Sequence, residues 1–375
     1  MSERINSHDN RATIRWKLMT GASALALTAY IASSAAACAD DSDHPLFWIE
    51  LGGQMEMLKG TSRTFTAPFM LLDPIPAPYL GATPTENQRA SNFAFGGDGK
   101  ITFQPENSDW IFSAEIRYGR SHVKRHVHHQ TIQHVTFYVT SRGKTYHESK
   151  YLAPFQDTKD RNSEHHAIVD FQAGRDLGIG LFGAQGSSTL SAGVRFAQLS
   201  ASSSLHITAR PSLGTTPFYP PFPGLPTFYQ YDLTAHAQRS FHGVGPSLSW
   251  NGSAALVGNL DRGELTLDMG LDAAVLFGKQ KAKTDHATKA YHFTYYSYSE
   301  IYPTRAHHST RSRSVTVPNA GGFIGLSWRS HDAKISFGYR AEILFGAMDT
   351  GIDARKTSNL TFNGPYASIS IGIGD

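Results

Sequence analysis

The residues in this sequence that could do chemistry are charged side chains placed at every second position inside otherwise apolar segments. Glu264, Asp268 and Asp272 share one set of alternate positions in ELTLDMGLDAAVLFG, and the other set is apolar. Side chains alternate between the two faces of a β-strand, so these carboxylates would line one polar face. The same alternation gives the full set of inward-facing candidates: Glu50, Glu56, Lys100, Glu115, Arg117, Asp170, Arg175, Asp176, Arg195, Glu264, Asp268, Asp272, Arg340 and Glu342.

Two roles are open for these charges. They either pair with one another and fill a narrow interior, or they form rings around a hydrated pore and set its selectivity. A barrel of about eight strands is nearly filled by its side chains, whereas porins of roughly 16–18 strands enclose wide channels. A barrel of intermediate size therefore favours a small or gated conductance over a general diffusion pore.

Histidine is the second chemical signal. Eight of the 18 histidines fall between Ser121 and His166. On a strand, His122, His126 and His128 would share a face, an arrangement that could bind zinc or copper. An exposed polar loop that is rich in histidine accounts for the same pattern, and no HExxH-type spacing is present. No resident metal or other cofactor is expected, and these three histidines are the metal candidates.

A hydrolytic site is the third possibility. Asp285 with His286, or Glu300 with His307 and His308, are of the residue types that outer-membrane barrel proteases place near their outer rim. The sequence contains neither a G-x-S-x-G nucleophile elbow nor a P-loop. We therefore expect that the protein is not an enzyme, and we retain an outer-membrane hydrolase as a minor alternative.

The segments that carry these residues alternate between apolar and polar positions and are longer than ordinary soluble strands, which have roughly 5–6 residues. A transmembrane strand needs about 9–11 residues, apolar toward lipid and polar toward the lumen. Aromatic residues near the strand ends (Trp48, Trp110, Trp250, Trp328 and Tyr366) are typical of an interfacial girdle. The expected strands are 47–58, 93–104, 110–120, 166–182, 189–199, 233–250, 264–278, 315–328, 334–345 and 366–373.

The connections between these segments alternate between long and short. Long ones follow the first, third, fifth, seventh and ninth strands, and the long segment 121–164 contains a candidate hairpin turning at Arg142-Gly143. Bacterial outer-membrane barrels have an even strand number, short periplasmic turns and long outer loops, whereas a soluble β-sandwich has no reason to sort its loops in this way. The sequence therefore predicts an all-β, closed antiparallel transmembrane barrel of about ten strands, within a range of roughly 8–12.

The N-terminal segment has the three regions of a secretory signal peptide. Arg11, Arg15 and Lys17 precede an apolar run that ends in small residues. Cleavage after Ala39 would leave residues 40–375 as one barrel domain, and the competing interpretation is a lipoprotein acylated at Cys38. The formal charge of +3 and the absence of a basic run argue against a nucleic-acid partner.

Several segments resemble the pore-forming outer-membrane barrel family typified by the Legionella major outer membrane protein: VDFQAGRDLGIGLF, LSAGVRFAQL, FHGVGPSLSW, LDAAVLFG and FGYRAEILFGAMD. The resemblance implies a porin-like barrel in the bacterial outer membrane and brings no catalytic residues. The partners to expect are outer-membrane lipid, the barrel-insertion machinery, and small solutes or ions. The alternative function is a closed barrel that acts as an adhesin or surface-binding protein through its long outer loops.

Overall fold

The computed structural model describes residues 47–60, 92–106, 108–130, 132–141, 143–152, 155–177, 186–210, 213–215, 226–259, 262–293, 298–352 and 354–373. The expected signal peptide lies outside these residues. Within them, no helix has the length and apolar character needed to cross a membrane. The regular elements are β1 (Phe47–Lys59), β2 (Asn92–Phe103), β3 (Trp110–Gln130), β4 (Gln133–Ser141), β5 (Lys144–Leu152), β6 (Phe155–Asp176), β7 (Gly186–Arg210), β8 (Leu213–Thr215), β9 (Pro226–Asn259), β10 (Gly263–Phe293), β11 (Tyr298–Ser330), β12 (Ala333–Asp349) and β13 (Thr357–Ile373).

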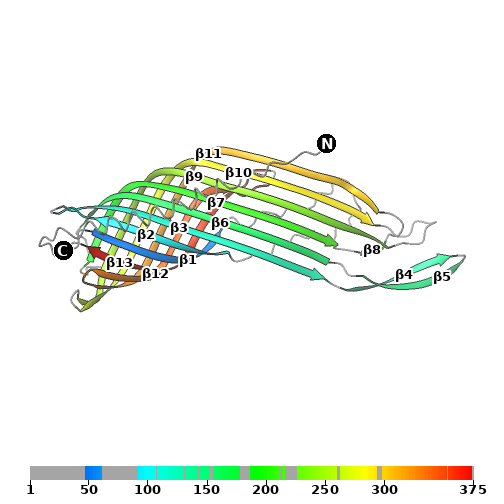
Figure 1. The fold of residues 1–375 in the computed structure, drawn as a ribbon, viewed down its shortest axis with the longest axis horizontal. Coiled ribbons are helices and arrows are strands. Elements are labelled where there is room, and N and C mark those ends of the chain that lie inside the picture. The colour runs from blue at the N-terminus through cyan, green and yellow to red at the C-terminus, as the bar shows by residue number, and fades with distance from the viewer. Residues whose placement is uncertain are drawn as a thin grey trace, which may run out of the picture.

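Ten of these strands close into an antiparallel barrel (Figure 1). The order around the barrel is β1-β2-β3-β6-β7-β9-β10-β11-β12-β13, and β13 pairs with β1 to complete it. The short strand β8 pairs only with β9, and β4 with β5 forms a separate two-stranded sheet. Closure leaves no free edge in the membrane, where unpaired backbone groups are costly. The predicted fold class is confirmed, and the β-sandwich alternative is wrong.

The barrel is apolar outside and polar inside. Leu271 on β10 and Phe337 on β12 are each 63 % exposed, whereas Arg195 on β7 is 2 % exposed. This distribution reverses that of a soluble domain, in which large apolar side chains are buried and charged ones face water. Trp110 and Trp328 lie on the outer face as a girdle requires. Trp48 lines the lumen together with Glu50, and Tyr366 points inward and is 6 % exposed. The exposed apolar side chains form a lipid-facing belt around the barrel.

Six neighbouring strands, β3, β6, β7, β9, β10 and β11, extend far beyond this belt at the end of the long connections (Figure 1). We call this extension the tall wall. β9, β10 and β11 have 34, 31 and 33 residues. Residues 121–130, 155–164, 280–293 and 298–314 are therefore strand, and their interpretation as loops was wrong. The outward side chains of these extensions are polar, whereas inward ones such as Leu205 and Leu233 are buried. The outward apolar row that marks the membrane segments is therefore absent, while the backbone pairing continues.

The hairpin expected within the second long connection is confirmed. β4 and β5 pair from Ser141 with Lys144 outward to Gln133 with Leu152. Gly143 has a φ of 74°, a left-handed conformation that glycine adopts without a steric penalty. The hairpin lies beyond the end of the tall wall (Figure 1).

Candidate functional site

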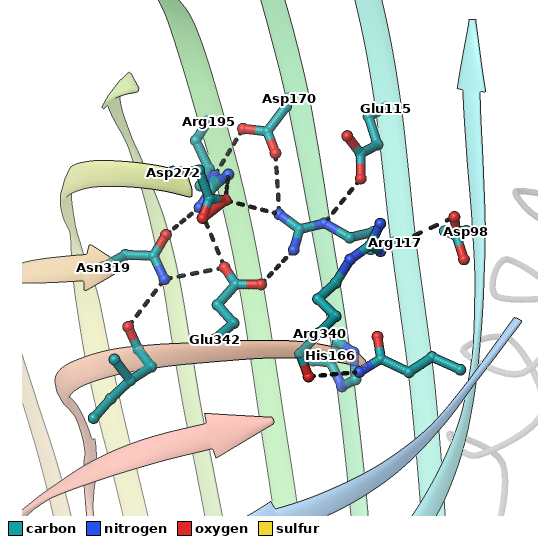
Figure 2. A network of polar contacts seen from close by, with 12 residues as sticks. Asp98, Glu115, Arg117, His166, Asp170, Arg195, Asp272, Asn319, Arg340 and Glu342 are labelled. Atoms are coloured by element: carbon teal, nitrogen blue, oxygen red, sulfur yellow. Dashed lines mark hydrogen bonds and ion pairs between the residues drawn. The ribbon is translucent and has the colours of Figure 1, made fainter. Parts of the chain in front are cut away.

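An ionic network crosses the middle of the lumen and is centred on Arg195 of β7 (Figure 2). Arg195 Nε donates to Asp170 Oδ1 at 2.7 Å, and Nη2 donates to Asp272 Oδ1 at 2.6 Å. Its Nη1 donates to Glu342 Oε1 at 3.2 Å and also contacts Asn319 Oδ1. The four partners come from β6, β10, β12 and β11, so one guanidinium joins opposite walls of the barrel.

Arg117 of β3 binds the same carboxylates from the other side (Figure 2). Its Nη1 donates to Glu342 Oε2 at 2.5 Å, and its Nη2 donates to Asp170 Oδ2 at 3.2 Å. Glu115 lies 3.3 Å from Arg117 Nε. The side chains of Asp170 and Glu342 are 4 % and 5 % exposed. Buried charges are tolerated when paired and hydrogen-bonded in this way, and leaving one unpaired is costly.

A third arginine, Arg340 of β12, lies near two aromatic rings next to this network. Its guanidinium carbon is 5.1 Å from the centre of the Tyr366 ring and 5.8 Å from that of Phe323. Asp98 of β2 lies 4.0 Å from Arg340 Nη1. Gly338 makes room for the Tyr366 ring, because a Cβ at this position would lie 2.6 Å from Tyr366 Cε1.

Two adjoining spaces, which share several lining residues, lie between the network and the end of the short turns. The outer one has a volume of about 650 Å³ and is lined by Trp48, Glu264 and Arg329 among others. The inner one, of about 220 Å³, reaches Asp170, Arg195 and other network residues. Glu50, Lys100 and Lys334 border both spaces. We call the two spaces together the vestibule; it is a charged cavity large enough for several water molecules.

An apolar layer fills the lumen on the other side of the network. His166 of β6 marks the boundary, since its Nε2 lies 3.4 Å from Glu56 and its ring centre lies 4.1 Å from that of Phe362. Buried polar side chains are present at this level and beyond it, namely Ser121, Glu164 and Gln280, but most of the buried inward side chains are apolar. These apolar side chains come from nearly every barrel strand and include Leu58, Ile168, Leu199, Phe241, Leu276, Val317, Leu344, Met348 and Phe362. The strand pattern predicts a lumen that is polar along its whole length, and the apolar layer shows that this prediction is wrong for one part of it.

The last residues of β12 and the residues that follow them lie inside the tall wall and close over this layer. We call residues 346–352 the inner strap. Arg239 of β9, 2 % exposed, donates from Nε to the Asp349 carbonyl oxygen at 2.7 Å. Arg311 of β11 donates to Asp349 Oδ2 at 2.9 Å and to the carbonyl oxygens of Gly351 and Ile352 at 2.8 and 2.7 Å. Ile352 packs against apolar side chains of β7 and β9.

The structure places most of the predicted inward residues inside the barrel. Glu56 pairs with His166, and the others border the vestibule or join the network: Glu50, Lys100, Glu115, Arg117, Asp170, Arg195, Glu264, Asp268, Asp272, Arg340 and Glu342. Their role in selectivity remains a prediction. Asp268 accepts from Lys334 at 2.5 Å.

Two of the predicted lumen residues are elsewhere. Arg175 has the outward parity of Phe171 on β6 and pairs with Asp109 at 2.5 Å, with both side chains more than 60 % exposed. Asp176 is the last residue of β6, is exposed, and accepts a hydrogen bond from the Ser188 backbone. Arg175 therefore lies on the outer face of the barrel, and Asp176 lies at the end of its strand, where the side chain is exposed.

The residues that sequence reasoning missed are Asp98, Asn319, Arg239, Arg311 and the strap carboxylate Asp349. Asp98 and Asn319 share the inward parity of Lys100 and Gly321, a signal that was available. Arg239 and Arg311 lie beyond the apolar segments, where no lipid-facing alternation marks the inward side. Only the fold of the inner strap shows what they bind.

The sequence profile of the family described as "Legionella pneumophila major outer membrane protein precursor" matches residues 75–373. The chain belongs to the Legionella major outer membrane protein family. It is thus an outer-membrane β-barrel, as expected. No curated protein sequence gives a match to it.

Two solved structures share low similarity with this family member. One is described as "Crystal structure of the P. putida toluene transporter TodX", with 10 % identity, 88 % of this chain and 90 % of that chain covered, and a TM-score of 0.17. The other, described as "TodX monoaromatic hydrocarbon channel deltaS2 mutant", has 11 % identity, coverage of 90 % and 93 %, and a TM-score of 0.19. Scores of this size carry no argument about the fold or the function.

The histidine candidates lie on the outer face of the tall wall of this Legionella-type barrel. His126 Nε2 and His128 Nδ1 approach Asp157 Oδ1 at 2.5 and 3.4 Å, whereas His122 pairs in register with Ser163. Among the residues that the structure describes, no group of three or more potential ligands is arranged to hold a metal ion.

Of the residues considered for a hydrolase, Asp285 and His308 lie on the same outer face, whereas His286 has the opposite parity on β10. Asp285 contacts His308 Nδ1, and both side chains are about half exposed, at 46 % and 57 %. The hydrogen bond from His308 lowers the pKa of Asp285 below its ordinary value. The side chains of Glu300 and His307 lie outside the described residues. The Asp285–His308 pair is therefore open to water and lies outside the network.

Proposed function

We propose that the protein is a porin-like channel that passes small polar solutes or ions across the outer membrane and that this structure is its closed state. The observation that carries the proposal is the charged vestibule, which runs from the short-turn end of the lumen to the network of Arg117 and Arg195. Outer-membrane barrels place their short turns in the periplasm, so the vestibule would open there. A space lined by both signs of charge suits hydrated polar solutes and does not suit apolar ones.

Two barriers in series support a closed state. The network ties β3, β6 and β7 to β10 and β12, and a solute must separate these ion pairs to pass. The apolar side chains of the layer cannot replace the hydration shell of an ion, and hydrophobic constrictions of this kind gate by losing their water. Opening therefore requires movement of the inner strap, which contributes Ala347 and Met348 to the layer.

Single-channel recording in planar bilayers tests the proposal. We expect the unmodified barrel to open rarely, because Arg239 and Arg311 hold the strap. Hydrogen bonds to a charged group contribute about 1.5–3 kcal/mol each, so losing one of them is sufficient for a tenfold shift in a two-state equilibrium. The double variant Arg239→Ala/Arg311→Ala should open at least about tenfold more often.

The matched control is the double variant Arg175→Ala/Arg262→Ala, which removes two exposed cations. It should behave as the unmodified protein does. Complete silence of the strap variant, in a barrel shown to be folded by its resistance to SDS at room temperature, would refute a gated channel.

A second function, attachment to a surface partner, has a specific observation behind it. The β4–β5 hairpin forms its own sheet outside the barrel, at the far end of the tall wall (Figure 1). An adhesin predicts that replacing residues 132–152 by a short turn removes binding to host or bacterial surfaces. A channel predicts that the same replacement leaves the conductance unchanged.

We also propose export through a cleaved signal peptide that ends at Ala39. N-terminal sequencing of the protein isolated from outer membranes should start at Asp40. An acylated N-terminal Cys38 would establish the lipoprotein alternative.

A further inference from the structure

A band of cationic side chains lies on the outward face of the tall wall, directly beyond the lipid-facing belt. We call it the basic collar: Arg120 and Lys124 of β3, Arg161 of β6, and Lys279, Lys281 and Lys283 of β10. All six residues are exposed. None of them takes part in the network, the vestibule or the inner strap, so the channel function does not use them.

The strand register shows how closely the collar follows the belt. The last apolar row on these strands consists of residues that pair one with the next: Ile116, Val169, Phe196, Val244 and Phe277. Two residues further along each strand, the next outward row contains Lys279, and the row after it contains Arg120 and Lys281. The change from apolar to cationic thus occurs within one step of the alternation.

The charge on this surface is almost entirely positive next to the belt. In the first three rows beyond the belt, the other described outward residues are uncharged or imidazole side chains: Tyr118, His122, Ser163, His165, Ala167, Gln198, Ser200, Ser202, Gln238, Ser240, His242, Thr310, Ser312 and Ser314. Carboxylates on this face start in the fourth row, where Asp285 lies in register with the collar residues Lys124 and Arg161. Both Asp285 and Asp157 contact histidines. A surface with this composition carries a net positive charge and many hydroxyl donors.

We propose that the basic collar binds the phosphorylated headgroups of lipids in the outer leaflet of the outer membrane. A lipid whose acyl chains contact the belt places its headgroup at the rows where the collar begins. Lysine and arginine form charge-assisted hydrogen bonds with phosphate oxygens, and serine hydroxyls between them can donate further bonds. Because the long connections of outer-membrane barrels face outward, the collar lies on the outer-leaflet side. The lipid is therefore the occupant that both the charge and the position fit.

Native mass spectrometry of the detergent-solubilised barrel, titrated with diphosphorylated lipid A, tests this. Each basic residue near an anionic lipid surface increases the affinity about fivefold, so removing three should weaken binding roughly 100-fold. The test variant is Lys279→Ser/Lys281→Ser/Lys283→Ser. The matched control, Lys144→Ser/Arg175→Ser/Arg262→Ser, removes the same charge at exposed positions away from the collar and should bind as tightly as the unmodified protein.

Three outcomes would overturn the proposal. The first is equal affinity of the collar variant and the control. The second is equal binding of lipid A from which both phosphates have been removed, which would mean that the acyl chains alone bind. The third is full displacement of lipid A by inorganic phosphate at millimolar concentration, which would identify a site for free phosphate.

A second variant, Arg120→Ser/Lys124→Ser/Arg161→Ser, should show the same loss of affinity. Because its substitutions lie on β3 and β6, it also controls for misfolding of β10 in the first variant.

Discussion

Arg117 and Arg195 share Asp170, Asp272 and Glu342 so that each guanidinium stabilises carboxylates that the other also needs. The consequence is strong coupling between these five side chains. Removal of either arginine leaves buried carboxylates with too little positive charge. The remaining charges then carry a desolvation penalty that the ion pairs had offset.

Substitution of Arg195 by alanine should therefore destabilise the barrel by roughly 3–5 kcal/mol. Equilibrium unfolding by urea in phospholipid vesicles, followed by tryptophan fluorescence, measures this. Arg175→Ala is the control, because that arginine forms an exposed ion pair with Asp109 and should cost no more than about 1 kcal/mol. Equal effects of the two substitutions would contradict the assignment of Arg195 to the centre of the network.

Asp157 lies on the tall wall, outside the membrane, and its contact with His126 gives a prediction about the pKa of its carboxyl group. The hydrogen bond from His126 lowers the pKa of Asp157 below its ordinary value, against a smaller opposing effect of burial. A carboxylate with a lowered pKa in the folded state stabilises that state above its unfolded pKa, about 3.9, and the stabilisation is lost as the pH falls. In His126→Ala the pKa of Asp157 should rise, as carbon-13 NMR of the labelled carboxyl group would show. His122→Ala, on the same face of β3, should leave it unchanged.

Parity along a strand was sufficient to predict most of the interior residues but could not identify their partners. Asp268 and Asp272 have the same sequence signal, yet one binds Lys334 and the other binds Arg195. The difference depends on which strands face each other across the lumen. That arrangement follows from barrel closure and is not encoded in any single segment.

At the scale of strands, the tall wall and the lipid-facing belt obey different rules although they are parts of the same elements. On β10, Leu271 contacts lipid, whereas Lys281 lies ten residues further along in water. Alternation of apolar and polar residues is therefore a signal of the membrane segment only. This is why the ten membrane strands can be predicted from the sequence, whereas the sequence of their extensions resembles that of loops.

The same distinction predicts the effect of new charges. Leu271→Arg places a cation on the lipid face and should destabilise the barrel by about 2–4 kcal/mol. Ser312→Arg, at an exposed position of β11 beyond the belt, should have almost no effect, because its side chain remains in water. Unfolding in vesicles of defined thickness compares the two. A large cost for Ser312→Arg would show that the belt extends further than the exposed apolar residues indicate.

For the whole molecule, the order vestibule, network, apolar layer and inner strap means that the two ends of the lumen are not equivalent. The only cysteine of the chain is Cys38, which lies before the barrel. A cysteine introduced into the lumen would therefore be the only reactive thiol after signal cleavage. Accessibility can then be measured from each side of the membrane separately.

Lys100→Cys, in the vestibule, should react with a membrane-impermeant maleimide supplied at the short-turn side and should be protected from reagent on the other side. Adding the strap substitutions Arg239→Ala and Arg311→Ala should remove that protection. Reconstituted vesicles with one barrel orientation provide the measurement. Labelling of Lys100→Cys from both sides in the absence of the strap substitutions would mean that the lumen is open.

The span of the ionic network along the chain has a consequence for folding kinetics. Arg117 and Glu342 are separated by 225 residues, and Arg195 and Glu342 by 147. Contacts between residues so distant form after local hairpins, since the loop-closure entropy is lost before such contacts contribute. The network therefore assembles late, when β13 meets β1 and the circle of strands is complete. Substitutions in it should leave the rate of folding nearly unchanged and accelerate unfolding, which makes these buried charges the determinant of how long a finished barrel lasts.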